Sequence, residues 1–302
     1  MRIWLDTDIG SDVDDALTLA YLLRHPGFEL AGLSTVFGDV ELRSEIALAL
    51  LEIGGAPNLP VITGLGAPLS PGRQGLMFGH EGQGILESPA PRLRTDSEPD
   101  RNERIERLAD AVGKAEADVI VAIGPLSNLA ALIEAGLSLP PLAIMGGKLS
   151  DVMVRGMIEG VPEWNWFTDP LAAQIVIGAQ HTTLPRVVPA EVTFRTALAD
   201  GDVERMAEGD PLTRQLAVLC RRWLEFLGPH TGNEEPKVVL HDPLTAAILV
   251  EESLCPFEAK RIEIDDRAAS TLVDGAPNVS AAIDVDAPAL RDHLMQTWLP
   301  EG

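Results

Sequence analysis

Short apolar runs alternate with segments of helical periodicity through the first two-thirds of the chain. Four apolar runs are typical of buried strands: 2–5, 29–36, 119–123 and 142–145. Three segments repeat apolar residues at helical spacing: 15–24, 42–53 and 126–136. Since strand–helix–strand units of this kind are right-handed and place their strands in parallel, the pattern predicts an α/β fold. We expect an open, mostly parallel, doubly wound (Rossmann-like) sheet.

Two irregular segments interrupt this alternation. Residues 64–100 and 228–236 contain many glycines, prolines and polar residues and have no long periodic element. After them come two alternating segments, 258–264 and 279–285, and a helical pattern from Ala287 onward. A loop as long as 64–100 inside a compact chain is usually either a functional lid or disordered. We therefore predict one domain over residues 1–302, with mobile lid segments in both loops.

The composition and net charge of the chain limit the classes of ligand that it is expected to bind. The 302 residues are 46% hydrophobic, which is enough to bury a large core. They include 46 acidic and 23 basic residues, for a net charge of −23. Nucleic acids and anionic membrane surfaces are bound through clustered Lys and Arg, so the acid excess argues against both. A cation, or a small ligand held through a cation, fits this charge better.

Cysteine usage and the N-terminus indicate the compartment. Cys220 and Cys255 are far apart and form no metal signature, so we expect buried free thiols in a reducing compartment. The chain reaches Asp6 before any apolar run of signal-peptide length, and no stretch approaches the length of a membrane span. A cytoplasmic protein is predicted.

The most distinctive segment is residues 6–15, between the first strand and the first helix. It holds five carboxylates: Asp6, Asp8, Asp12, Asp14 and Asp15. Helix capping needs one or two acids, although a solvated capping cluster is the alternative interpretation. Carboxylates packed this densely repel one another unless a cation compensates, and hard oxygen donors favour Ca²⁺ or Mg²⁺ over Zn²⁺. The spacing does not fit an EF-hand.

Two further polar clusters follow apolar segments. Glu163 and Asn165 come after a glycine-containing loop and are candidates to contact a polyhydroxyl ligand, whereas Asp169 before Pro170 predicts a helix N-cap. Asp242 stands between His241 and Pro243, where a capping Asp before a helical Pro is the structural interpretation. The alternative is a metal carboxylate beside a histidine that acts as a general acid near neutral pH.

These motifs together resemble the inosine–uridine-preferring nucleoside hydrolases. They occur in the family's order and span nearly the whole chain. The segments that carry the resemblance are Asp6–Ala16, Gly124–Ala130, Gly146–Gly147, Glu163–Pro170 and His241–Pro243. The resemblance implies an enzyme that hydrolyses the N-glycosidic bond of ribonucleosides to free base and ribose. It also implies a nucleoside hydrolase-type fold, a single Ca²⁺ and assembly as a homodimer or homotetramer.

The resemblance also implies roles for individual residues. The Ca²⁺ ligands would be the carboxylates of Asp8, Asp15 and Asp242 and the main-chain carbonyl of Ile123. Asp8 would also deprotonate the attacking water. The remaining implied roles are sugar binding by Asp14 at the 2′-hydroxyl and by Glu163 and Asn165, and protonation of the leaving base by His241.

The chain departs from the family pattern at several positions. Ser11–Val13 are three residues where the family motif has one, Asp39 stands where Asn is common, and Met157 replaces an Asn that contacts the 5′ side of the sugar. Asp39 and Met157 are therefore expected at the sugar with altered contacts. His80 lies in the first long loop and either lines the pocket or is an exposed loop histidine. The spacing of Trp223 and Phe226 predicts core packing.

Two other functions compete with this interpretation. A haloacid-dehalogenase-like phosphatase would explain Asp6 and Asp8 after an N-terminal strand, but Gly10 replaces the Thr or Val which that motif expects, and Asp14 and Asp15 stay unexplained. A non-catalytic, Ca²⁺-dependent riboside-binding protein would explain the altered Asp39 and Met157. Purine or pyrimidine preference does not follow from the sequence.

Overall fold

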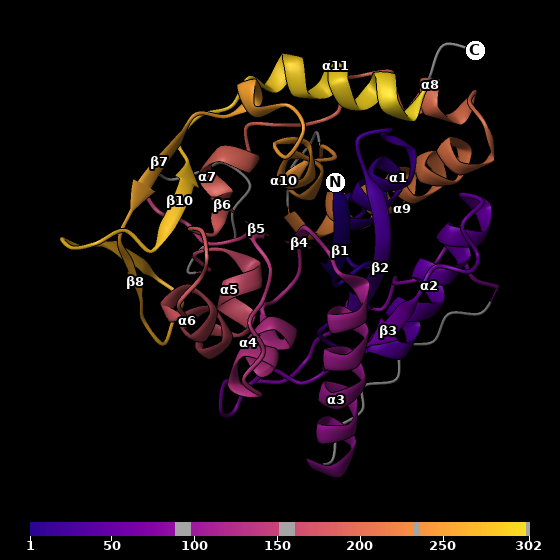
Figure 1. Cartoon of the computed structure of the whole chain (residues 1–302). Coiled ribbons are helices and arrows are strands. Elements are labelled where there is room, and N and C mark those ends of the chain that lie inside the picture. Colours follow the sequence, from indigo (N-terminus) through magenta and orange to yellow (C-terminus); the bar gives the residue numbers. More distant parts are fainter. Residues whose placement is uncertain (88–97, 151–160, 232–235, 300–302) are drawn as a thin grey trace.

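The computed structural model describes residues 1–87, 98–150, 161–231 and 236–299. Its central feature is an eight-stranded sheet in the order β3-β2-β1-β4-β5-β6-β10-β7 (Figure 1). The strands are β1 (Arg2–Thr7), β2 (Glu29–Thr35), β3 (Val61–Thr63), β4 (Val119–Ala122), β5 (Leu142–Met145), β6 (Arg186–Val188), β7 (Phe257–Lys260) and β10 (Val279–Ala282). All neighbouring pairs are parallel except β10 with β7. The predicted α/β fold with a mostly parallel sheet is confirmed.

Helices cover both faces of this sheet, as a doubly wound fold requires (Figure 1). On one face lie α1 (Asp14–Arg24), α2 (Val40–Ile53), α7 (Ala190–Thr193), α8 (Asp202–Ala207), α9 (Pro211–Thr231), α10 (His241–Ala247) and α11 (Ala287–Trp298). On the other lie α3 (Glu98–Ala115), α4 (Ser127–Glu134), α5 (Trp164–Thr168) and α6 (Pro170–Gly178). Each layer has its own apolar core, because alternate residues of a strand point to opposite faces. Leu5 and Val121 face the first core, and Trp4 and Ile120 face the second.

Three boundaries differ from the sequence predictions. α3 begins inside the segment 64–100 and was not predicted, because its first three turns are mostly charged and carry little apolar periodicity. α9 continues to Thr231, so it enters the predicted loop 228–236 and includes Pro229 close to its end. The alternating segment 258–264 forms two strands in different sheets, β7 and β8 (Ile262–Ile264), the latter paired with β9 (Ser270–Leu272).

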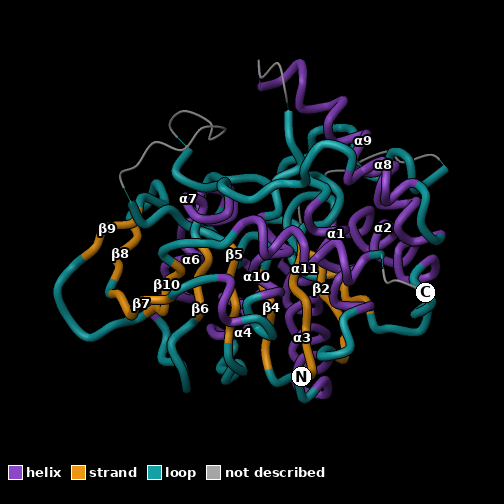
Figure 2. The backbone as a smooth tube through the Cα atoms, turned by 90° about the horizontal axis from the view of Figure 1, so that it is seen from above, coloured by secondary structure: helices purple, strands orange, loops and turns teal. Residues whose placement is uncertain are grey.

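The order in which strands are added to the sheet reverses beside β1. From β1 the chain builds outward through β2 and β3, then returns to add β4 on the other side of β1. At such a switch point the loops leave in opposite directions, and ligands bind outside the carboxyl ends of the strands. Figure 2 shows α9 projecting beyond the sheet at this end. The acidic segment follows β1 at the same place.

The cysteines and the helices were also compared with the sequence predictions. Cys220 and Cys255 are both buried and free, as expected. Across the described residues, no helix combines the length and apolar character needed to cross a membrane.

Candidate active site

The acidic loop between β1 and α1 brings buried carboxylates to the switch point. Asp8 follows the last residue of β1, and Asp14 and Asp15 open α1. All three side chains are buried. Val13 occupies the N-cap position of α1, and no side chain caps the helix there. The acids of this loop are therefore not a solvated capping cluster.

Helix α10 adds a fourth carboxylate from a distant part of the chain. Leu240, not Asp242, is its N-cap residue, and no side chain makes a capping hydrogen bond. The capping interpretation of Asp242 is therefore wrong, since its side chain lies in the first helical turn. The Asp242 N–H instead donates to Asp14 Oδ2 at 3.2 Å. One carboxylate oxygen from each of Asp14, Asp15 and Asp242 lies within 4.8 Å of the others.

Burial and mutual repulsion make this cluster unfavourable without a cation. Burial, followed by the charges of neighbouring aspartates, raises the pKa of Asp14, Asp15 and Asp242 well above the ordinary value. Burial also raises the pKa of Asp8, against the opposing charge of Arg43. A bound cation would offset both effects. Because the donors are all buried carboxylate oxygens, the residues present fit a hard divalent metal ion.

The loop after β4 lies between the acidic loop and α5, in contact with both. The Ile123 carbonyl accepts a hydrogen bond from Asn165 Nδ2 at 3.0 Å, so these two predicted site residues are in direct contact. Gly124 follows, and a Cβ there would lie 2.9 Å from both Asp8 N and Asp8 Oδ1. Glycine is thus required for this loop to approach Asp8. Below it, Asn128 Nδ2 donates to Asp6 Oδ1 at 2.7 Å, and burial raises the pKa of Asp6 to about 7.

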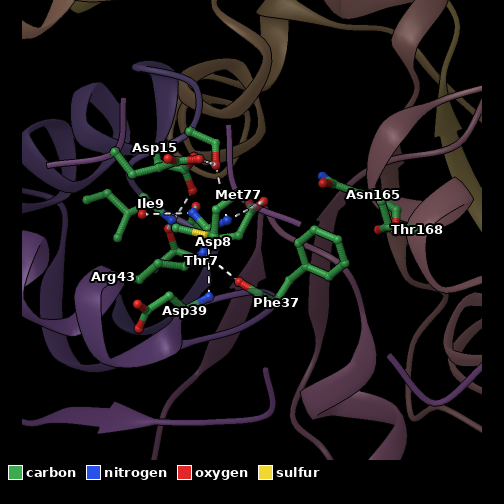
Figure 3. Close-up of polar contacts among 12 residues, drawn as sticks. Thr7, Asp8, Ile9, Asp15, Phe37, Asp39, Arg43, Met77, Asn165 and Thr168 are labelled. Carbon is green, nitrogen blue, oxygen red and sulfur yellow. Dashed lines mark hydrogen bonds and ion pairs between the residues drawn. The ribbon is translucent and has the colours of Figure 1, made fainter. Parts of the chain in front are cut away.

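Helix α5 lies across from the acidic loop (Figure 3). Figure 3 shows Asn165 and Thr168 across from Asp8 and Asp15. Glu163 is the N-cap residue of α5 and accepts hydrogen bonds from the N–H groups of Gly147, Asn165 and Trp166. Burial raises its pKa to about 7 despite these bonds.

The predicted capping role of Asp169 is confirmed at the next helix. Its side chain accepts from the Ala172 N–H at the start of α6. The same carboxylate accepts from Leu69 N, Ser70 N and Oγ, and Ser127 Oγ. Asp169 therefore ties the loop after β3 to α4 and α6, a structural role.

The segment 76–86, here called the flap, lies against the acidic loop. Its His80 places Nε2 2.7 Å from the Ser11 carbonyl and stacks on Phe226 with ring centroids 4.0 Å apart. Phe226 also stacks on Trp223, at 5.6 Å. His80 is half-buried, so it is not a fully exposed loop histidine. Trp223 packs, partly buried, against the first apolar core, as predicted, and with Phe226 and His80 it also forms an aromatic stack.

The remaining predicted residues lie in three different settings. Asp39 is the N-cap of α2 and accepts from the Leu42 N–H at 3.0 Å. His241 begins α10, with Nδ1 2.6 Å from Thr193 Oγ1 and its ring edge-to-face with Phe194. Burial lowers the pKa of His241 to about 4, so its ring is neutral at pH 7. Met157 lies outside the described residues.

Sequence reasoning missed four side chains that hold the site together. Thr193 engages His241, Arg43 contacts the acidic loop, and Ser11 and Glu81 join that loop to the flap. Ser11 lies inside the acidic motif and Glu81 stands next to His80, but neither position indicates a contact between them, and Arg43 and Thr193 belong to no motif. Their importance depends on contacts between segments far apart in sequence.

Comparison with known proteins identifies the family of this chain. The family profile "Inosine-uridine preferring nucleoside hydrolase" matches residues 3–292. The chain belongs to this family. It is therefore an N-glycosidic hydrolase that acts on ribonucleosides, and neither the phosphatase nor the non-catalytic alternative is supported.

Curated relatives of this nucleoside hydrolase carry several substrate names. The chain is 28% identical to "Uridine nucleosidase 1" of Arabidopsis thaliana, over 87% of this chain and 78% of that protein. It is 26% identical to the "Pyrimidine-specific ribonucleoside hydrolase RihA" of Klebsiella pneumoniae, over 98% of this chain and 97% of that protein.

Solved structures of nucleoside hydrolases share the fold. The "Purine-Preferring Ribonucleoside Hydrolase from Gardnerella vaginalis" superposes with a TM-score of 0.76 at 25% identity, covering 99% of this chain and 98% of that one. The "Plant nucleoside hydrolase - PpNRh1 enzyme" gives a TM-score of 0.79 at 23% identity, covering 99% of both chains. At 23% identity, the similarity to the plant enzyme shows a shared fold and nothing more.

Proposed function

We propose that this nucleoside hydrolase is calcium-dependent and cleaves the N-glycosidic bond of ribonucleosides to give free base and ribose. The observation that carries the proposal is the convergence of Asp14, Asp15 and Asp242 at the switch point, beside Asp8. These carboxylates come from two segments more than 200 residues apart and would repel one another without a cation. Ca²⁺ takes six to eight oxygen ligands, so it leaves positions for sugar hydroxyls and water.

Asp8, Asp15, Asp242 and the Ile123 carbonyl would hold the ion. Asp14 is close to the carboxylates of Asp15 and Asp242, so it could act as a further ligand. The family resemblance implies instead that it accepts a hydrogen bond from the sugar 2′-hydroxyl. When bound, Ca²⁺ would lower the pKa of a coordinated water and orient the ribose hydroxyls. Asp8 would accept the proton from that water. The negative charge of the pocket would stabilise the oxocarbenium-like transition state of glycoside cleavage.

The sugar would lie between the acidic loop and α5. Asn165 faces the acidic loop in Figure 3 and is the direct sugar ligand in this proposal. Glu163 uses its carboxylate on three backbone N–H groups, so it would act mainly by fixing the turn that carries Asn165. Asp39 and Met157 remain the candidate contacts on the 5′ side.

His241 would assist departure of the base. With Nδ1 engaged by Thr193 Oγ1, Nε2 is the ring nitrogen left to carry the transferred proton. The protonated ring, a minor form at pH 7, would give this proton to the base and return to the neutral imidazole. The aromatic stack of His80, Trp223 and Phe226 is the candidate surface on the base side. A homodimer or homotetramer in the cytoplasm is part of the proposal, from the family resemblance and the free thiols.

A panel of ribonucleosides tests the proposal. Purified enzyme, stripped with a calcium chelator and then resupplied with Ca²⁺ or Mg²⁺, is assayed for free ribose with inosine, guanosine, uridine, cytidine and adenosine. We expect ribose release that disappears on chelation and returns with Ca²⁺. Undiminished release in chelator would overturn calcium dependence. Release of ribose from none of the substrates with Ca²⁺ present would overturn ordinary ribonucleosides as the substrate class.

A further inference from the structure

Arg43 is a fully buried guanidinium beside the proposed metal site, with 0% of its surface exposed. It reaches from the first turn of α2 toward the acidic loop, as Figure 3 shows. Its donors contact the carbonyls of Phe37 (Nε, 2.6 Å), Asp8 (Nη1) and Ile9 (Nη1, 3.0 Å) and the Ser11 hydroxyl (Nη2, 3.1 Å). Nη2 also lies 4.0 Å from Asp8 Oδ2. One side chain thus holds the segments that follow β1 and β2.

This arrangement needs arginine in particular. A guanidinium presents five donors in a planar fork, whereas a lysine ammonium presents three around one point. The Arg43 guanidinium donates hydrogen bonds to three carbonyls and one hydroxyl, which belong to four residues. Its charge is buried among acids, which offsets part of the repulsion within the acidic loop. A residue that only filled space would use neither property.

The contacts continue from Ser11 to the flap. The Ser11 hydroxyl accepts from Arg43 and donates to Glu81 Oε1 at 3.2 Å, while the Ser11 carbonyl lies 2.7 Å from His80 Nε2. Glu81 is fully buried and accepts from the N–H groups of Phe78 (2.6 Å) and Gly79 (2.7 Å). Ser11 belongs to the residues that lengthen the acidic motif relative to the family pattern. The added length therefore provides two of the contacts that hold the flap.

We propose that Arg43 is a positioning residue that holds the Asp8–Ser11 turn for metal binding and, through Ser11, holds the flap against that turn. This inference rests on the proposed function in so far as Asp8 serves the Ca²⁺ site. Arg43 touches neither metal nor substrate. Its effect passes through the backbone at Asp8 and through the Ser11 hydroxyl.

The test compares Arg43→Lys with a matched substitution away from the site. Arg291→Lys serves as the control, because Arg291 also uses its fork, on Asp202, but lies in α11. Three experiments are run well below each variant's melting temperature. Calorimetry gives the Kd for Ca²⁺, a ribose assay gives kcat and KM, and hydrogen exchange is followed at Phe78 and Gly79. Ser11→Ala, which removes one hydroxyl, is measured alongside in case Arg43→Lys does not fold.

For Arg43→Lys we expect the Ca²⁺ Kd to rise about 10- to 100-fold, as is typical when a residue supporting a metal ligand is lost. We also expect kcat at saturating Ca²⁺ to fall by more than KM changes. Ser11→Ala should speed exchange at Phe78 and Gly79 and alter the Ca²⁺ Kd less. Arg291→Lys should lower the melting temperature without moving the Kd, kcat or flap exchange.

Two results would overturn the inference. If Arg43→Lys only lowers the melting temperature and keeps the wild-type Kd and kcat, Arg43 is a structural residue. If Ser11→Ala leaves flap exchange unchanged, the link to the flap is wrong. Failure of the wild type to bind Ca²⁺ would instead remove the proposed cofactor, and Arg43 would then be judged by kcat and flap exchange alone.

Discussion

Identical residue types take different roles here because their surroundings differ. Asp169 and Asp39 cap helices through backbone N–H groups, whereas Asp14, Asp15 and Asp242 lie beside one another in a buried cluster. A capping carboxylate is stabilised in its charged form by the donors around it. A buried carboxylate among other carboxylates is disfavoured in its charged form unless a cation compensates. This contrast separates aspartates held by hydrogen-bond donors from aspartates that need a cation.

Removing one member of the cluster should abolish the metal site. We expect Asp15→Ala to lose both bound Ca²⁺ and ribose release, because the ligand set loses an anionic donor. Metal analysis of the dialysed protein and a ribose assay measure this. Asp110→Ala, in an exposed ion pair of α3, is the control and should change neither. Full calcium occupancy in Asp15→Ala would remove Asp15 from the ligand set.

His241 should matter only when the base needs a proton. We expect His241→Ala to lower kcat on ribonucleosides by about 10²- to 10⁴-fold, the usual contribution of general acid catalysis, with a smaller effect on KM. Nitrophenyl riboside has a leaving group that needs no protonation and should be largely spared. Thr193→Val, which removes the partner of Nδ1, should show the same selectivity to a smaller degree. An equal loss on both substrates would contradict the role.

Gly124 tests whether Asp8 must keep its position. A methyl group there would lie 2.9 Å from Asp8 Oδ1, so we expect Gly124→Ala to weaken Ca²⁺ binding although no ligand is removed. Gly113→Ala is a matched control, because a Cβ at Gly113 meets nothing within 4 Å. Calorimetric Kd values compare the two variants. Equal affinity in both would show that Asp8 tolerates displacement or is not a ligand.

At the scale of elements, charged contacts join helices that the sheet alone does not connect. Asp202 in α8 accepts hydrogen bonds from Arg291 of α11 at 2.6 and 2.7 Å and from the Ala199 N–H at 2.8 Å. Burial raises the pKa of Asp202, but these hydrogen bonds and the charge of Arg291 outweigh it and hold the pKa below its ordinary value. The paired carboxylate therefore stabilises the fold when it is ionised.

We expect Asp202→Asn to cost about 1–3 kcal/mol of unfolding free energy at pH 7, the scale of hydrogen bonds to a charged group. Since the folded pKa is depressed, this stability is present above the unfolded pKa of about 3.9 and is lost as the pH falls through the folded value. Urea unfolding of both proteins at pH 7 and pH 3 measures the difference, which should shrink at pH 3. A constant difference would assign the loss to packing.

Strands and buried helices were predictable at this scale, and contacts between elements were not. The β-branched run 119–123 and the apolar stripe of residues 15–24 carry their own periodicity, and both match the structure closely. α3 carries mostly charged residues in its first turns, so its helix could not be predicted from an apolar stripe. Arg43 and Thr193 are recognised only through partners that the fold brings near. A local pattern holds no information about such distant partners.

At the scale of the whole molecule, the order of strands explains why the motifs lie together. The acidic loop and Ile123 end adjacent strands, β1 and β4, and α10 packs against α1, which brings Asp242 to Asp14. The net charge of −23 gives the molecule a field that repels polyanions. A neutral nucleoside is not repelled by it. The fold therefore concentrates negative charge where a cation and a developing oxocarbenium ion would both be stabilised.

Titration of Ca²⁺ into chelator-stripped enzyme tests the central claim most directly. Bound calcium and the rate of ribose release are measured in the same samples at each point. We expect the rate to rise in proportion to occupancy and to level off at one Ca²⁺ per chain. A full rate at zero occupancy, or a rate that does not change as the site fills, would contradict calcium-dependent hydrolysis at this site.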